Sequence, residues 1–271
     1  AGIAMSLAIK FFAVLPLLFV AYVGSAAEDF DLVAIPTGTA VLGDPEGDDN
    51  EIERSVHIPA FRLMRREVTN RQFARFVDDS GYRTTVENTG KGNVWWLRWR
   101  LIDGADWRHP AGPKSNLEGL LDHPTVQVSA LDGEAFCQFY GMRLPSEDEW
   151  EYAARGPQGY RYAWGNTLTR DTLAAYVNAG SFDCCAASAA DGFSRTAPVG
   201  SFPLGRSPFG LDDMAGNVWE WTSSPFPGAA EKRAIRGGGW GNNPYCLRTA
   251  YRHGNPPHIG LDMVGFRCAA P

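Results

Sequence analysis

The sequence predicts an α+β domain that is low in regular secondary structure. Glycine (30 residues) and proline (18 residues) are frequent enough in this 271-residue chain to interrupt helices and strands repeatedly. Aromatic residues make up 12% of the chain, and few segments carry the spacing of a helix. We therefore expect short elements, long loops and a fold held by aromatic packing and local cross-links.

The first 27 residues are predicted to be a leader outside the folded domain. Residues 1–4 precede the first methionine and are typical of a cloning remnant. Lys10 is followed by an apolar run over residues 11–23 and by small residues at 25–27, which indicates a secretory signal cleaved after residue 27. A membrane anchor is the alternative, but the run is shorter than the roughly 20 residues that span a bilayer. The folded domain is expected over residues 28–271, exported and without membrane contact after cleavage.

The start of the mature chain has the alternation of short strands. One strand is expected from Phe30 until Pro36 ends it, a second over residues 40–43 and a third over residues 56–58. The acidic run at residues 46–49 predicts a solvated loop.

Three helices are marked by start and stop signals. Thr69 and Gln72 form a capping box that predicts a helix ending near Gly81. A second helix is expected over residues 129–140, and another capping box opens a third over residues 146–156. After that point no segment has convincing helical length.

Composition and missing motifs exclude several classes of function. The chain has 25 Lys and Arg against 31 Asp and Glu, a net charge of −6, and no basic stripe that would neutralise a row of phosphates, so nucleic acid is not expected as a partner. There is no Gly-x-Ser-x-Gly, His-Glu-x-x-His or Cys-x-x-Cys, and the glycines at 237–239 lack the Lys-Ser/Thr of a phosphate loop. No flavin, haem or nicotinamide motif is visible, so no organic cofactor is expected. The sequence carries no signal for oligomeric state.

Residues 237–254 concentrate chemically active side chains. Glycines, aromatic rings, a cysteine, two arginines and a histidine lie close together there, and a tryptophan-rich run near residue 95 adds a second aromatic cluster. The alternative for each residue is a place in the core of an aromatic-rich fold. As a group they are candidates for a site that binds a planar or peptide-like ligand. The candidates are Trp95, Trp96, Trp99, Trp240, Asn242, Tyr245, Cys246, Arg248, Arg252, His253 and His258.

Three ordered motifs carry a family resemblance. They are 143-RLPSEDEWEYAARG-156, 215-AGNVWEWTSS-224 and 264-VGFRCA-269, and segments 106–113 and 122–129 join them. In this order they resemble the formylglycine-generating enzyme, or sulfatase-modifying factor, family over nearly the whole mature chain. The resemblance implies a single domain related to the C-type lectin fold and often bound to calcium.

Two loop segments match the family's calcium positions and have suitable oxygen chemistry. Calcium takes six to eight oxygens from carboxylates, amides and backbone carbonyls, and in this fold it would be structural rather than catalytic. The alternative is that the acidic residues of the second set cap turns or pair with arginines. The first set is Asn178, Ala179, Asp191 and Phe193, and the second is Asp213, Gly216, Val218 and Glu220.

The resemblance also implies a structural disulfide between Cys137 and Cys268. The chain has five cysteines, so at least one remains free or pairs with another chain. The three that remain are Cys184, Cys185 and Cys246.

The catalytic members of the family bind copper(I) through two cysteines five residues apart. Here the first of those positions is Asn242, and the second falls beside Cys246 only if one residue is deleted. Gly239 and Met263 replace a serine and an asparagine of the catalytic members. We therefore expect no copper at the family cysteine site and no activation of sulfatases. Cys246 is then a relic, a partner for Cys184 or Cys185, or part of a different site.

The exported members that lack this cysteine pair suggest a function. The leader, the chain length and residues 61–77 are similar to members that act in pyoverdine maturation. The resemblance implies a periplasmic protein that oxidises the chromophore of a siderophore precursor, dihydropyoverdine, to pyoverdine. Oxygen would act directly or through an unpredicted metal, because no motif identifies the electron acceptor.

Roles for the candidate residues follow from this hypothesis. We predict Tyr245, Cys246, Arg248 and His253 to be catalytic. The predicted substrate contacts are Trp95, Trp96, Trp240, Asn242, Arg252 and His258. The main alternative is a non-catalytic, calcium-stabilised module that binds a ligand or a protein, and a sulfatase activator with unusual ligands is the third.

Overall fold

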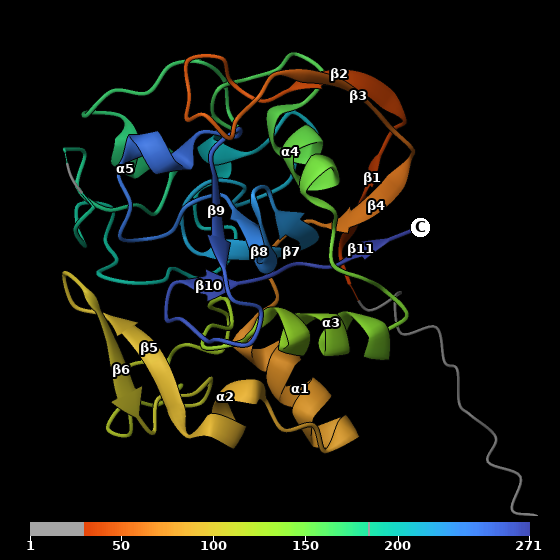
Figure 1. Cartoon of the computed structure of the whole chain (residues 1–271). Coiled ribbons are helices and arrows are strands. Elements are labelled where there is room, and N and C mark those ends of the chain that lie inside the picture. The colour runs from red at the N-terminus through yellow and green to blue at the C-terminus, as the bar shows by residue number, and fades with distance from the viewer. Residues whose placement is uncertain (1–29, 184) are drawn as a thin grey trace, which may run out of the picture.

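The structure is a computed structural model that describes residues 30–183 and 185–271. The predicted leader and its cleavage point lie outside these residues. In the described part of the chain, no helix is both long enough and apolar enough to span a bilayer. Short helices and small sheets are connected by long loops (Figure 1), as the glycine and proline content predicts.

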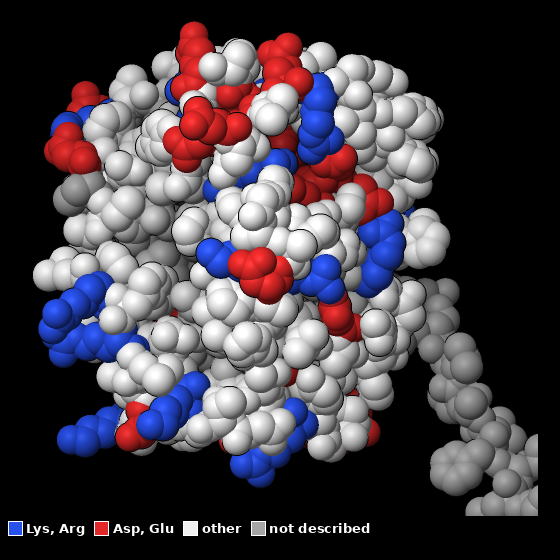
Figure 2. All heavy atoms as spheres, viewed as in Figure 1, with Lys and Arg blue, Asp and Glu red and all other residues white. Residues whose placement is uncertain are grey.

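The first and last strands of the chain meet in one sheet. β1 (Leu32–Ile35) and β11 (Ala269–Ala270) lie on either side of β4 (Phe61–Met64), and both are antiparallel to it. β2 (Gly38–Leu42) and β3 (Arg54–Ile58) form a hairpin whose loop carries the acidic run. Figure 2 shows acidic side chains gathered on this upper part of the molecule, whereas basic side chains lie mainly lower down.

The central sheet has the order β10-β7-β8-β9 and supports the candidate site. β7 (Trp219–Phe226) and β8 (Ala229–Arg236) form an antiparallel hairpin, and β9 (Arg252–Asn255) pairs with β8. The short strand β10 (Val264–Gly265) is parallel to β7. A separate hairpin of β5 (Lys91–Trp95) and β6 (Trp99–Asp103) projects at the lower left of Figure 1.

The three predicted helices are confirmed, and their capping signals explain their bounds. α1 (Asn70–Ser80), α3 (Ala130–Phe139) and α4 (Glu147–Arg155) each begin after a reciprocal capping box. α1 ends at Gly81 and α4 at Gly156, and both glycines have a positive φ. A fourth helix, α2 (Thr85–Thr89), was not predicted, although it too begins after a capping box. The remaining helical turns are α5 (Leu173–Tyr176), η2 (Pro203–Gly205) and η3 (Pro244–Leu247).

Aromatic rings fill the main core between α1, α3 and the central sheet. Phe136 of α3 lies 5.9 Å from the ring of Phe73 and 5.3 Å from that of Phe266. The disulfide predicted from the family resemblance is confirmed, because Cys137 of α3 is bonded to Cys268 beside this cluster. The C-terminal segment is therefore attached covalently to the middle of the chain.

Candidate functional site

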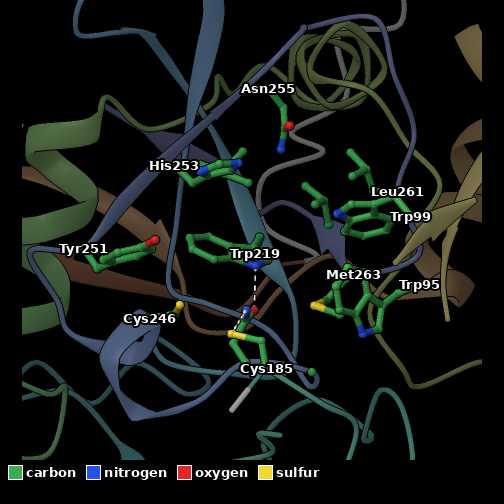
Figure 3. A pocket seen from close by; sticks show the side chains of 14 residues that line it. Trp95, Trp99, Cys185, Trp219, Cys246, Tyr251, His253, Asn255, Leu261 and Met263 are labelled. Carbon is green, nitrogen blue, oxygen red and sulfur yellow. Dashed lines mark hydrogen bonds between the residues drawn. The ribbon is translucent and has the colours of Figure 1, made fainter. Parts of the chain in front are cut away.

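A pocket of about 240 Å³ opens between the central sheet and the β5–β6 hairpin. Most of its wall is aromatic or aliphatic, which suits a planar apolar group. Figure 3 shows the two thiols at one end, His253 and Asn255 at the other and the Trp219 indole between them. The lining residues are Trp95, Trp99, Cys185, Trp219, Ile235, Gly241, Asn242, Cys246, Tyr251, His253, Asn255, Leu261, Met263 and Val264.

Strand β9 brings the polar end of the pocket together. Side chains two residues apart on a strand point to the same face, so His253 and Asn255 both reach the pocket. The pKa of His253 is lowered, because desolvation and the nearby charge of Lys232 disfavour the imidazolium. His253 is therefore neutral near pH 7 and can accept a proton or a hydrogen bond.

Asn242 orients the central indole of the pocket. Its Oδ1 accepts hydrogen bonds from Nε1 of Trp219 at 2.8 Å and from the backbone N–H of Gly239 at 3.0 Å. Its Nδ2 lies 3.8 Å from Sγ of Cys185. Asn242 was predicted to contact the substrate; in the structure it lines the pocket and holds the Trp219 indole in place.

Cys246 lies buried in the pocket wall beside two partners. It makes side-chain hydrogen bonds with Cys185 and with Tyr251. Burial is the main reason that the pKa of the Cys246 thiol rises to about 12, and the neighbouring Cys185 adds to it. Without a cation, Cys246 is thus a neutral thiol at pH 7 and a weak nucleophile.

The structure does not bring Tyr245 and Arg248 into the pocket, which corrects two predicted catalytic assignments. The hydroxyl of Tyr245 donates to Oδ1 of Asp48 at 2.5 Å at the surface. The buried Arg248 donates to both oxygens of Glu51, at 2.8 and 2.9 Å, and to Asp44 at 2.9 Å. Its charge is satisfied by acidic residues about two hundred positions earlier, so it holds the β2–β3 loop in place.

The pocket also excludes Arg252, Trp240 and His258, three of the predicted substrate contacts. Arg252 is paired with Glu147 at 2.8 Å and donates to the backbone carbonyl of Asn50. Trp240 is 1% exposed and lies in the core. His258 is exposed on the loop that follows β9.

The predicted tryptophan cluster is divided between two surroundings. Trp95 and Trp99 face each other across the hairpin, with ring centroids 5.2 Å apart, and both line the pocket. Trp96 is exposed outside it and lies 5.2 Å from the guanidinium of Arg195. Arg195 also covers the Trp240 ring and pairs with the buried Asp262 behind the pocket.

Several pocket residues were not singled out in advance. Trp219 stood in a recognised motif, but its role depends on the register of β7. Tyr251 lies inside the candidate stretch but was not chosen, Asn255 directly follows it, and Cys185 comes from a distant loop. These residues share only their position around the pocket, which forms when the chain folds.

The first predicted calcium set is brought together in the structure. Asp191 accepts the backbone N–H groups of Ala179 at 3.1 Å and Phe193 at 2.9 Å. Nδ2 of Asn178 donates to the carbonyl of Arg195, whereas its buried Oδ1 has no partner among the described residues. An unpartnered amide oxygen beside a carboxylate is suitable chemistry for calcium.

The second predicted set lies in a buried cluster of charges. Both oxygens of Glu220 accept from Arg267 at 2.7 Å, and one also accepts from Nε1 of Trp150. This is the arginine pairing considered as the alternative to calcium. Asp213 accepts the backbone N–H of Gly200 at 2.6 Å.

Glu67 is a further acidic residue of this cluster and was not among the predicted ligands. Its pKa is raised well above the ordinary value, because it is buried and lies near Asp213 and Glu220. Its Oε1 has no hydrogen-bond partner within the described residues. In the part of the chain that is described, no three His, Cys, Asp or Glu side chains converge on one point as a metal site. Any calcium here would need backbone and amide oxygens as well.

Comparison with known proteins identifies the family. Residues 23–271 match the sulfatase-modifying factor enzyme 1-like domain. The inactive C-alpha-formylglycine-generating enzyme 2 of Bos taurus is 35% identical over 271 residues, covering 89% of this chain and 88% of that protein. Hercynine oxygenase of Mycobacterium tuberculosis is 33% identical over 263 residues, covering 86% of this chain and 58% of that protein.

A solved structure extends the likeness to three dimensions. PvdO from Pseudomonas aeruginosa has a TM-score of 0.67 and 25% sequence identity, covering 88% of this chain and 93% of that one. The shared fold and the match along nearly the whole described chain lead to one conclusion. This chain belongs to the sulfatase-modifying factor enzyme 1-like family, whose members include the formylglycine-generating enzymes.

Proposed function

We propose that this protein is an exported oxidoreductase that acts on an aromatic group of a peptidic siderophore precursor in the periplasm. The specific reaction proposed is oxidation of the dihydropyoverdine chromophore to pyoverdine. The observation that carries the proposal is the aromatic-walled pocket with a neutral histidine at one end. The likeness to PvdO and the relation to an oxygenase support it.

Different residues of the pocket would make different contacts with such a substrate. A planar chromophore would pack against the indoles of Trp95, Trp99 and Trp219, because aromatic rings favour offset or edge-to-face contact. His253 would accept a phenolic proton as the ring is oxidised, and Asn255 would hydrogen-bond a polar edge of the ring. The substrate loses two electrons and two protons, and dioxygen takes up both and becomes hydrogen peroxide.

A matched pair of histidine variants tests this proposal. His253→Ala removes the histidine of the pocket, whereas His258→Ala removes a similarly exposed histidine outside it. We expect the dihydro precursor to accumulate in a deletion strain and in the His253→Ala strain, but not in the His258→Ala strain. Mass spectrometry of the siderophore intermediates measures this directly. Normal pyoverdine from the deletion strain would refute the proposal.

The second candidate function is a non-catalytic ligand-binding module. The relation to an inactive formylglycine-generating enzyme 2 favours it, as does Asn242, which stands where the catalytic members have the first of their two copper-binding cysteines. Such a module would bind the aromatic ligand in the same pocket but would leave it chemically unchanged. Tight binding without any change in ligand mass, in air and in the presence of metal, would decide for this module.

We also propose structural calcium in the loop of Asn178 and Asp191. The unpartnered Oδ1 of Asn178 and the carboxylate of Asp191 would be joined by the backbone carbonyls of Ala179 and Phe193. A hard cation would stabilise the conformation of this loop by joining oxygens from two of its segments. Removal of calcium with EGTA should lower the melting temperature, and added calcium should restore it. A melting temperature that does not respond to either, with no calcium by elemental analysis, would contradict the proposal.

Sulfatase activation remains outside the proposed function. Asn242 occupies the position of a copper ligand in the catalytic members, and its carboxamide is hydrogen-bonded to Trp219. We expect no conversion of a Cys-x-Pro-x-Arg peptide to formylglycine. Mass spectrometry of the incubated peptide checks this expectation.

A further inference from the structure

The β5–β6 hairpin carries a group of exposed apolar side chains. Leu97 is 81% exposed, Leu101 61% and Trp96 54%, and Trp99 is exposed as well. All four belong to one projecting hairpin, at its tip and on its second strand (Figure 1). Single exposed leucines are common on protein surfaces, whereas a group of this kind marks a surface that contacts another molecule or a membrane.

Leu97 lies at the tip of the hairpin in an unfavourable backbone conformation. The loop of residues 96–98 is closed by a hydrogen bond from the backbone N–H of Trp96 to the carbonyl of Arg98 at 3.0 Å. Leu97, between them, has a φ of 62°, in the left-handed region that glycine or asparagine adopts with less strain. The leucine therefore strains the turn and exposes an apolar side chain to water, so local folding does not account for it.

Two exposed arginines flank the apolar side chains. Lys91 at the base of the hairpin pairs with Asp103 at 3.1 Å, but Arg98 and Arg100 make no ion pair with a residue that the structure describes. Figure 2 shows basic side chains projecting at this edge of the molecule. Because the whole chain has a net charge of −6, the hairpin is a local exception whose charge is complementary to an anionic surface.

The size and shape of this surface favour a membrane over a protein partner. A stable protein interface buries about 800 Å² on each partner, which a single projecting hairpin tip does not supply. Reversible membrane binding requires less, because a few apolar side chains in the headgroup region act together with nearby cations. Tryptophan suits the headgroup level of a bilayer, and arginine can donate two hydrogen bonds to one phosphate.

We propose that the tip of the β5–β6 hairpin docks this protein reversibly on an anionic phospholipid membrane. Trp96 and Leu97 insert among the headgroups, and Arg98 and Arg100 contact lipid phosphates. Trp99 belongs both to this surface and to the pocket wall, so docking places the pocket beside the lipid. No membrane contact was expected after cleavage of the leader, and this proposal departs from that expectation. It is independent of the proposed oxidation, because lipid binding is measured without a substrate.

Co-sedimentation with lipid vesicles tests the proposal on the mature protein, because the apolar leader would itself bind lipid. We expect binding to vesicles of equal parts phosphatidylcholine and phosphatidylglycerol, and little binding to phosphatidylcholine alone. Added salt should weaken the binding, since it screens the arginines. Leu97→Asn should lower the affinity about tenfold, because the leucine no longer leaves water. Arg98→Gln/Arg100→Gln should lower it about thirtyfold, whereas Arg98→Lys/Arg100→Lys should retain most of it.

An exposed leucine elsewhere on the surface provides the matched control. Leu204 is 59% exposed in η2, outside the hairpin, and Leu204→Asn should leave vesicle binding unchanged. Leu97→Asn should not lower the melting temperature, because asparagine adopts the left-handed conformation readily, so its loss of binding cannot come from unfolding.

Three results would overturn the proposal. They are no binding to the anionic vesicles, equal binding to both kinds of vesicle, and unchanged binding by Leu97→Asn. If the hairpin instead joins two copies of this chain, sedimentation equilibrium will show a dimer that Leu97→Asn dissociates, without lipid binding. None of these results bears on whether siderophore intermediates accumulate in the deletion strain.

Discussion

Removal of the Cys137–Cys268 disulfide should cause a large loss of stability. The bond closes a loop with a sequence separation of 131, for which the chain-entropy model gives about 5 kcal/mol at 25 °C. That is a large share of the roughly 5 to 15 kcal/mol by which native domains are stable. A domain of this size changes its melting temperature by about 2 to 4 °C per kcal/mol. The double variant Cys137→Ala/Cys268→Ala is therefore expected to melt about 10 to 20 °C lower.

Urea denaturation separates the cross-link from the loss of buried sulfur. Cys246→Ala is the matched control, because it removes a buried thiol that is not cross-linked. The double variant should also have a larger m-value, because its unfolded chain is no longer held compact and exposes more surface. A double variant no less stable than the control, with an unchanged m-value, would refute the entropic reasoning.

Three further predictions concern the surroundings of the pocket. Burial raises the pKa of Asp262 from 3.8 to about 6, so the folded protein binds this proton more tightly than the unfolded chain does. The contribution of Asp262 to the free energy of unfolding should fall as the pH rises from about 4 to about 6. Asp262→Asn should remove this pH dependence, which urea denaturation at several pH values measures. Arg195→Met leaves the buried Asp262 without its ion-pair partner and should lower the free energy of unfolding by about 3 kcal/mol in the same assay. The control variant Arg98→Met, at an exposed position, should change it little. If His253 is the base, the oxidation rate should rise with pH around a midpoint below 6.5, because its pKa is lowered; a rate that falls over that range would exclude this role.

The parts of the fold that sequence could predict are those set by local chemistry. The capping box at Thr69 and Gln72 defines the start of α1, and Gly81 defines its end through its left-handed conformation. The β7–β8 hairpin was not predicted, because Pro225 interrupts its strand pattern and its register shifts there. The disulfide needed the family resemblance, since spacing alone cannot pair five cysteines.

The sequence indicated a stretch that contributes residues to the pocket, but it could not show which residues of that stretch line it. His253 and Cys246 line the pocket as predicted, yet Arg248 from the same stretch does not. The difference is a pair of acidic residues in the β2–β3 loop, which neutralise Arg248 after the chain has folded. Cys185 was considered only as one possible partner of Cys246, because its place in the pocket depends on loop packing rather than on spacing.

The segment from Val264 to Ala270 has a consequence for how the protein is made. Within these few residues one strand completes the central sheet, Arg267 pairs with the buried Glu220, Cys268 forms the disulfide, and another strand joins β4. Contacts so distant in sequence are slow to form and cannot begin during early synthesis. The newly made chain must therefore remain without a finished core until this segment has left the ribosome. The Cys137–Cys268 disulfide can therefore form only after nearly all of the described chain has been synthesised.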